Sequence, residues 1–178
     1  MNEADTRAQF IDPALTASGW GIVEGSKIHR EYHINPGKIQ TGGTRAKPLI
    51  ADYILQYKGC KLAVIEAKSD ELPVGEGVPQ AKNYAEKLQL QTAFAANGKE
   101  IYQIDMVSGS ERLVPSFPTP EKLWNNTFAV QNQLRDPFNS VPFEDIGGTK
   151  SLRYYQEIAV NRTLEAIAAG KDRILLTL

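Results

Sequence analysis

Two carboxylates and one ammonium group carry the most specific chemical signal in the sequence. Asp52 lies in one apolar run of the chain, and Glu66 and Lys68 lie in the next one. The turn Lys58-Gly59 separates the two runs, a pattern typical of a β-hairpin near the middle of a sheet. Because alternate side chains of a strand share one face, we expect Glu66 and Lys68 to project together, beside Asp52.

This combination of side chains suits the hydrolysis of a phosphodiester. Paired carboxylates hold Mg²⁺ while substrate phosphate and water fill its remaining positions. A neighbouring lysine can orient or deprotonate the attacking water and balance the growing negative charge. The same three residues could instead form a solvated ion pair on a strand face. Their position inside apolar runs opposes this alternative, because burying Asp52 and Glu66 costs free energy unless a metal or partner satisfies them.

Composition excludes several other classes of protein. The 178 residues include one cysteine, Cys60, and two histidines, so an internal disulfide and a Cys/His zinc site are both excluded. No apolar stretch is long enough for a signal peptide or a membrane span, and we expect a cytoplasmic protein without membrane contacts. The net charge is −1, which argues against a generally basic nucleic-acid coat.

A local segment is nevertheless basic, with a balance of +4 from Lys38, Arg45, Lys47, Lys58, Lys61 and Lys68 against Asp52 and Glu66. These cations could engage phosphates or simply be solvated.

Strands and helices are expected to alternate around this hairpin. The first helix should be capped by Asn2, kink at Asp12-Pro13 and end at Gly19. Its predicted apolar stripe consists of Phe10, Ile11, Ala14 and Leu15. Periodicity and turn residues predict the hairpin at 48–55 and 62–68, further strands at 27–34, 92–96 and 100–104, and helices at 80–90 and from Thr119 onward.

The hairpin residues resemble the PD-(D/E)xK nuclease motif. Ala51-Asp52 matches its first half, with alanine in place of proline, and Glu66-Ala67-Lys68 matches its second half. This resemblance implies a restriction-endonuclease-like α/β core, a mixed central sheet flanked by helices. It also implies that Asp52, Glu66 and the Ala67 carbonyl hold Mg²⁺, for which Mn²⁺ can substitute, and that Lys68 positions the water.

A glutamine and a tyrosine in the following helix strengthen the match. Gln80 and Tyr84 resemble the QxxxY motif of the RecB-like branch, in which both residues share a helix face beside the metal site. The resemblance implies that they orient the lysine or contact DNA. Taken alone, the pair would be an ordinary feature of an amphipathic helix; its place shortly after the Asp…Glu-x-Lys pattern makes it specific.

The whole arrangement resembles the N-terminal nuclease region of the R subunit of type I restriction enzymes. The stretch from Glu3 to Arg7 resembles that family's opening motif, and Glu3 is a candidate acidic contributor to the metal site. Its alternative role is that of a helix-dipole carboxylate near an N-terminus. The resemblance implies double-stranded DNA as substrate and, in the full-length protein, modification and specificity subunits as partners.

The C-terminal part of the chain resembles the beginning of a superfamily 2 helicase domain. We expect a nuclease domain at 1–130, a linker at 131–150 and a truncated motor domain at 151–178. The motor part should contain a helix at 154–169 and a buried parallel strand at 173–178. Gln156 matches the adenine-reading glutamine, whereas the Walker A lysine is absent, so ATP is expected only in the full-length protein.

The sequence therefore predicts the endonuclease domain of a type I restriction enzyme, with cutting coupled to ATP-driven translocation in the full-length protein. Two alternatives remain open: a catalytically silent DNA-binding or assembly module of the same fold, and a free-standing repair or recombination nuclease. His29 and His33 share one strand face and could bind a metal, although packing is the favoured interpretation.

Overall fold

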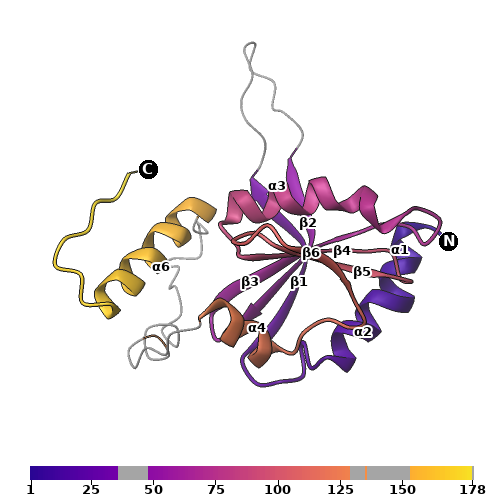
Figure 1. The fold of residues 1–178 in the computed structure, drawn as a ribbon, viewed down its shortest axis with the longest axis horizontal. Coiled ribbons are helices and arrows are strands. Elements are labelled where there is room, and N and C mark those ends of the chain that lie inside the picture. The colour runs from indigo at the N-terminus through magenta and orange to yellow at the C-terminus, as the bar shows by residue number, and fades with distance from the viewer. Residues whose placement is uncertain (36–47, 129–134, 136–152, 178) are drawn as a thin grey trace, which may run out of the picture. The chain divides into compact units, whose positions relative to one another are not determined.

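A six-stranded mixed sheet forms the centre of the N-terminal part of the chain, with helices on both of its faces (Figure 1). The computed structural model describes residues 1–35, 48–128, 135 and 153–177. The strands follow one another across the sheet in chain order, and only β3 and β4 run parallel. Their bounds are β1 Ser26–Asn35, β2 Leu49–Tyr57, β3 Cys60–Ala67, β4 Thr92–Ala96, β5 Ile101–Asp105 and β6 Glu111–Val114.

The predicted hairpin lies in the middle of this sheet. Strands β2 and β3 pair antiparallel and are joined by Lys58 and Gly59, which both have positive φ angles, 48° and 79°. Two such residues form the tight turn whose twist matches that of paired strands. Most residues of the two strands are buried, as expected for the centre of a sheet covered on both faces.

Helices cover the two faces unequally. Helix α3 packs against β3, β4 and β5, and α4 packs against β2 and β3. Figure 1 shows α3 on one side of the strands and α2 and α4 on the other. The helical bounds are α1 Glu3–Thr6, the π-helical segment η1 Arg7–Ile11, α2 Asp12–Ala17, the 3-10 segment η2 Val74–Gly77, α3 Val78–Leu88, α4 Pro120–Thr127 and α6 Tyr154–Ala168.

The N-terminal helix is interrupted as expected at its proline, and the interruption takes the form of a π-helical turn. Asp12 donates its backbone N–H to the Arg7 carbonyl, five residues earlier, and α2 then begins at Asp12. A wider turn accommodates the ring of Pro13 and its missing N–H. Ile11 and Leu15 are buried as predicted, but Phe10 is 41% exposed, so the predicted apolar stripe was too wide.

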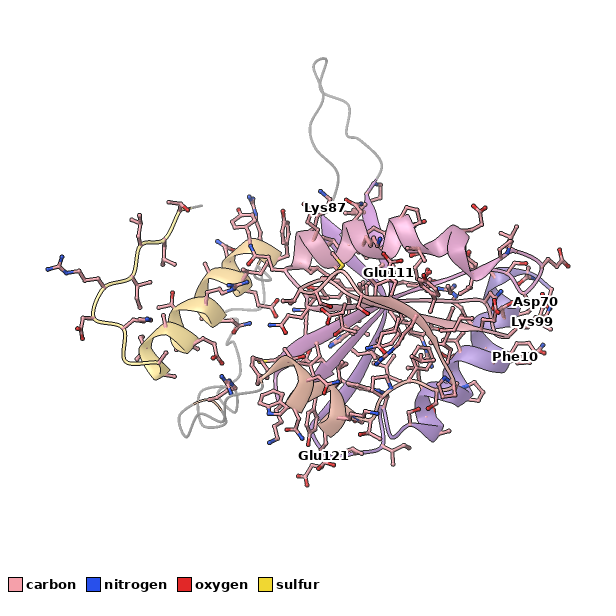
Figure 2. All side chains as sticks on the ribbon, in the orientation of Figure 1. Phe10, Asp70, Lys87, Lys99, Glu111 and Glu121 are labelled. Carbon is pink, nitrogen blue, oxygen red and sulfur yellow. The ribbon has the colours of Figure 1, made fainter. Side chains whose placement is uncertain are left out.

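Phe10 packs at the end of the sheet instead of in the core. A Cβ atom on Gly98 would come within 2.9 Å of the Phe10 ring, and Gly98 has a φ of +82°. Glycine is therefore required in this predicted Asn97-Gly98 turn for both its conformation and its close contact. Figure 2 shows Phe10, Asp70 and Lys99 at this same end of the molecule, where Lys99 Nζ lies 3.6 Å from Asp70 Oδ2.

Most of the predicted elements are present, with two differences. Strand β6 was not predicted, because Glu-Arg-Leu-Val is short, largely exposed and lacks an apolar alternation. The predicted strand at 173–178 was wrong over its described residues: positions 173–177 form no strand, and Leu175 and Leu176 are exposed. A strand needs a neighbour for its backbone N–H and C=O groups, and none of the described residues pairs with this segment.

The chain divides into two compact units, 1–128 and 129–178. In the second unit, α6 occupies the predicted helical segment and Gly170, with a φ of 71°, follows its end. Arg135 donates two hydrogen bonds to the Glu165 carboxylate within this unit. None of the helices in the described ranges is long and apolar enough to cross a membrane. The predicted linker at 131–150 lies almost wholly outside the described residues.

Candidate functional site

Asp52 and Glu66 lie side by side on the two central strands. Tyr53 of β2 pairs with Ile65 of β3, and the antiparallel register brings the preceding Asp52 next to Glu66. Asp52 Oδ2 accepts a hydrogen bond of 2.7 Å from the backbone N–H of Ala67. The side chain of Asp52 is 18% exposed and that of Glu66 is 4% exposed. The hairpin thus places one accessible and one buried carboxylate together.

Lys68 connects this pair to helix α3. Its Nζ donates to Glu66 Oε1 at 2.7 Å and to Gln80 Oε1 at 3.2 Å. Gln80 Nε2 in turn donates to the Tyr84 hydroxyl at 2.7 Å. Gln80 and Tyr84 are neighbours because residues four apart share one face of a helix. The structure therefore brings together all five side chains that sequence motifs singled out at this place.

Glu66 has the most perturbed environment of the group. Burial raises the pKa of its carboxyl group to about 7, the charge of Asp52 adds to this, and the hydrogen bond and charge of Lys68 oppose it. Its second oxygen, Oε2, is buried and has no hydrogen-bond partner among the described residues. A buried carboxylate oxygen without a partner is costly. Such an oxygen is suited to receive a ligand.

Lys68 and Tyr84 respond to the same charges. Burial alone would lower the pKa of the Lys68 ammonium, but its hydrogen bond to Glu66 and the nearby carboxylates raise it above its ordinary value. Burial raises the pKa of Tyr84, and the charges of Glu66 and Asp52 contribute. At neutral pH Lys68 is therefore a cation and Tyr84 is a neutral hydroxyl. Both can donate hydrogen bonds.

Glu3 approaches the site from the start of α1. Its charge contributes to the raised pKa of both Glu66 and Lys68, so its carboxylate acts on the group electrostatically. The capping role of this helix end belongs to Asn2, whose side chain accepts from the Asp5 N–H. The position of Glu3 is consistent with the predicted acidic contribution, which stays a prediction.

Arg7 is the charged residue of the site to which sequence reasoning gave no role. Its Nη1 lies 3.4 Å from Asp52 Oδ1, and its Nη2 lies 3.4 Å from Glu31 Oε1. The available signal was its place one helical turn after Glu3, within the segment that resembles a family motif. Motif comparison alone could not show that Arg7 reaches across to β1 and β2.

Gly77 also contributes to the site without having been singled out for it. It precedes α3, and a Cβ atom there would lie 3.1 Å from Ala95 Cβ and 3.4 and 3.5 Å from the Cγ atoms of Glu66 and Lys68. The absence of a side chain therefore lets the start of α3 approach the catalytic candidates closely.

The oxygen groups of the site suit a hard divalent cation such as Mg²⁺, provided that water or phosphate supplies the remaining ligands. Across the described ranges, which omit 36–47 and most of 129–152, no group of three or more His, Cys, Asp or Glu side chains is arranged to hold a metal ion. Asp52, Glu66 and the Ala67 carbonyl would supply part of a coordination sphere, and the unpartnered Glu66 oxygen fits this role. Mg²⁺ commonly retains several waters or phosphate oxygens beside one or two carboxylates.

The remaining candidate residues lie elsewhere. His29 Nε2 is 2.7 Å from Gln56 Oε1, so one of its ring nitrogens is already in a hydrogen bond. In the second unit, Gln156 Oε1 accepts from the backbone N–H of Arg153, at the start of α6. Of the predicted basic segment, Lys38, Arg45 and Lys47 lie outside the described residues.

Comparison with known proteins shows what this chain is similar to. The type I restriction enzyme EcoAI endonuclease subunit of Escherichia coli is 32% identical over 190 residues, a match that covers 100% of this chain and 23% of that protein. The chain is thus similar to a subunit of a type I restriction enzyme. This confirms the resemblance drawn from the sequence motifs. No family model matches the chain.

A solved structure agrees with the sequence relative. A fragment assigned as the HsdR subunit of a type I restriction enzyme from Vibrio vulnificus YJ016 superposes with a TM-score of 0.87 and 37% sequence identity, and the match covers 99% of this chain and 34% of that one. The restriction-endonuclease-like α/β fold predicted from the motifs is thereby confirmed. The chain spans 23% and 34% of the lengths of these two proteins.

Proposed function

We propose that residues 1–128 form a metal-dependent endonuclease that hydrolyses phosphodiester bonds of double-stranded DNA. The observation that carries this proposal is the buried Glu66 carboxylate, which lies beside Asp52. Its Oε1 accepts a hydrogen bond from Lys68, and its Oε2 has no hydrogen-bond partner among the described residues. The relationship to an endonuclease subunit supports the same activity. Mg²⁺ is the proposed cofactor, with Mn²⁺ as a substitute.

Asp52, Glu66 and the Ala67 carbonyl are the proposed metal-binding groups. When bound, the cation would polarise the phosphate and make a coordinated water more acidic. Water forms the new bond to phosphorus, the ester bond to the leaving oxygen breaks, and the proton of the water passes to solvent or to the leaving oxygen.

Lys68 and α3 have separate tasks in this proposal. Because Lys68 is cationic, it donates a hydrogen bond to the water or to a phosphate oxygen and stabilises the developing negative charge. Gln80 holds the lysine through its carbonyl oxygen, and Tyr84 holds the Gln80 amide in turn. Glu3 is proposed to add negative charge at the metal side.

A silent DNA-binding or assembly module is the second candidate, and one observation favours it. The side chain of Asp52 is already paired with Arg7, so one proposed metal ligand has a competing cation. In either case we propose that the longer protein adds ATP-driven translocation, with Gln156 contributing to an ATP site, and that it works with modification and specificity subunits.

Metal binding separates the two candidates. Titration calorimetry of the full chain with Mn²⁺ should show a site that is lost in Glu66→Gln and retained in Glu121→Gln, which alters an exposed glutamate of α4 (Figure 2). DNA cleavage by the assembled enzyme should require the same site. Mn²⁺ binding that is equal in all three proteins would favour the silent module.

A further inference from the structure

The two oxygens of Asp52 have different partners. Oδ2 is held at 2.7 Å by the backbone N–H of Ala67, a contact fixed by the pairing of β2 with β3. Oδ1 faces the Arg7 guanidinium at 3.4 Å. Ala67 therefore fixes the orientation of the carboxylate, and Oδ1 is the oxygen that another cation could take.

Arg7 has a second carboxylate within the same distance. Its Nη2 lies 3.4 Å from Glu31 Oε1, and the Glu31 side chain is 69% exposed whereas that of Arg7 is 21% exposed. Both distances exceed the usual 2.7–3.2 Å of N–H···O hydrogen bonds, which indicates weak contacts. A planar guanidinium can serve two carboxylates at once and can keep one of them when the other is withdrawn.

Two irregular stretches of backbone carry these side chains. Arg7 begins the π-helical segment η1. π-Helical turns are rare in proteins, and those that occur often lie at functional sites. Glu31, within β1, has a φ of 51° although it is not a glycine. Such a conformation is strained and persists where the surrounding structure enforces it. Arg7 and Glu31 therefore each lie in an irregular stretch of backbone.

We propose that Arg7 is a positioning residue of the metal site that occupies Asp52 Oδ1 in the metal-free protein and exchanges with the incoming cation. Glu31 is the group that retains Arg7 after the exchange. The pair thereby neutralises Asp52 before metal binds, and it sets how strongly metal is held. This inference rests on the proposed metal-dependent function and adds two residues to it.

The test measures Mn²⁺ affinity by calorimetry on the full chain without DNA. Arg7→Gln removes the competing cation and should tighten Mn²⁺ binding about two- to fivefold, the factor expected for a partly exposed ion pair. Arg7→Lys keeps the charge but cannot reach both carboxylates, and it should tighten binding less. Arg30→Gln is the matched control, because Arg30 pairs with Asp12, at 3.1 Å, and not with Asp52.

A double-mutant cycle separates exchange from simple charge effects. Glu31→Gln should weaken Mn²⁺ binding, because Arg7 is then held by Asp52 alone. The same substitution in an Arg7→Gln background should have no effect if Glu31 acts through Arg7. Thermal unfolding of each variant confirms that it is folded, and Arg7→Lys supplies the comparison if Arg7→Gln does not fold.

The outcomes are distinguishable from failure of the proposed function. Unchanged or weaker Mn²⁺ binding by the folded Arg7 variants, with binding still dependent on Glu66, overturns this inference alone. An equal effect of Glu31→Gln with and without Arg7 also overturns it. Mn²⁺ binding that does not depend on Glu66 overturns the proposed function and this inference together.

Discussion

Lys68 Nζ donates to Glu66 Oε1 at 2.7 Å, whereas Glu66 Oε2 is buried without a hydrogen-bond partner in the described part of the chain. The two oxygens of the Glu66 carboxylate thus differ: Oε1 has a strong hydrogen-bond donor, and Oε2 has none among the described residues. Because ionisation of a buried group without full compensation is unfavourable, the pKa of Glu66 is raised to about 7. The consequences of this asymmetry can be measured.

Metal-free protein should lose stability as Glu66 ionises. Its pKa is about 7 in the folded protein against a reference value of 4.5, so the stabilising effect of the protonated form is complete below pH 4.5 and is lost as pH rises through 7. Glu66→Gln should therefore show a smaller fall in the thermal unfolding midpoint over this interval. The measurement is differential scanning calorimetry in a chelator, with Glu121→Gln as the control. Parallel pH profiles of the Glu66 variant and wild type would contradict the expectation.

Removing the ammonium of Lys68 should impair cleavage more than metal binding. Lys68→Met retains most of the stem but loses the donor that is proposed to stabilise the transition state. Loss of such a donor typically lowers the rate by about 10²- to 10³-fold. Cleavage of DNA by the assembled enzyme gives the rate, and Mn²⁺ calorimetry gives the affinity.

Lys82→Ala is the matched control for the lysine variant. Lys82 lies on α3 and pairs with Glu111 instead of with a site residue. The Lys82→Ala enzyme should cleave DNA at the wild-type rate. A Lys68→Met enzyme that cleaves equally fast would exclude the proposed role of the ammonium.

The sequence was informative where local signals coincide. Three kinds of signal depend only on neighbouring residues: the Lys58-Gly59 and Asn97-Gly98 turns, the apolar runs, and the Gln80/Tyr84 spacing. The corresponding hairpins and helix are present. The close approach of Asp52, Glu66 and Lys68 follows from pairing of adjacent strands, which a hairpin makes unavoidable. Their catalytic roles stay predictions.

Features that depend on distant contacts could not be predicted in the same way. Arg7 reaches Asp52 across 45 residues of sequence, and nothing local to η1 indicates this partner. Strand β6 is held by pairing with β5 and not by its own hydrophobicity. The run at 173–177 shows the converse, because its apolar residues favour a strand but no described segment pairs with it.

Tyr84→Phe should slow cleavage while leaving metal affinity unchanged. The hydroxyl accepts from Gln80 Nε2 at 2.7 Å, and Gln80 in turn holds Lys68. Without the hydroxyl the Gln80 amide loses its orientation, and the rate should fall about fivefold, the factor that corresponds to a net loss of one hydrogen bond of about 1 kcal/mol. Single-turnover cleavage by the assembled enzyme measures the rate. Lys87→Ala, on the exposed face of the same helix (Figure 2), should have no effect; an equal loss in both variants would assign the effect to α3 in general.

Gly77→Ala should disturb the site through packing alone. The new methyl group would lie 3.1 Å from Ala95 Cβ and 3.4 Å from Glu66 Cγ, so α3 or β3 must shift by a few tenths of an ångström. Overpacking of this kind costs about 1 kcal/mol or more, and displacement of Glu66 should also weaken Mn²⁺ binding. Denaturant unfolding and Mn²⁺ calorimetry measure the two effects separately.

Gly75→Ala provides the control because it lies two residues earlier in η2 and a Cβ atom there would have no neighbour within 4 Å. It reduces backbone freedom in the unfolded chain to the same extent as Gly77→Ala, which should leave stability unchanged or slightly higher. The difference between the two variants therefore isolates the contact of residue 77 with the site. Equal stability and equal Mn²⁺ affinity in both variants would show that the close approach of α3 to Glu66 does not constrain the site.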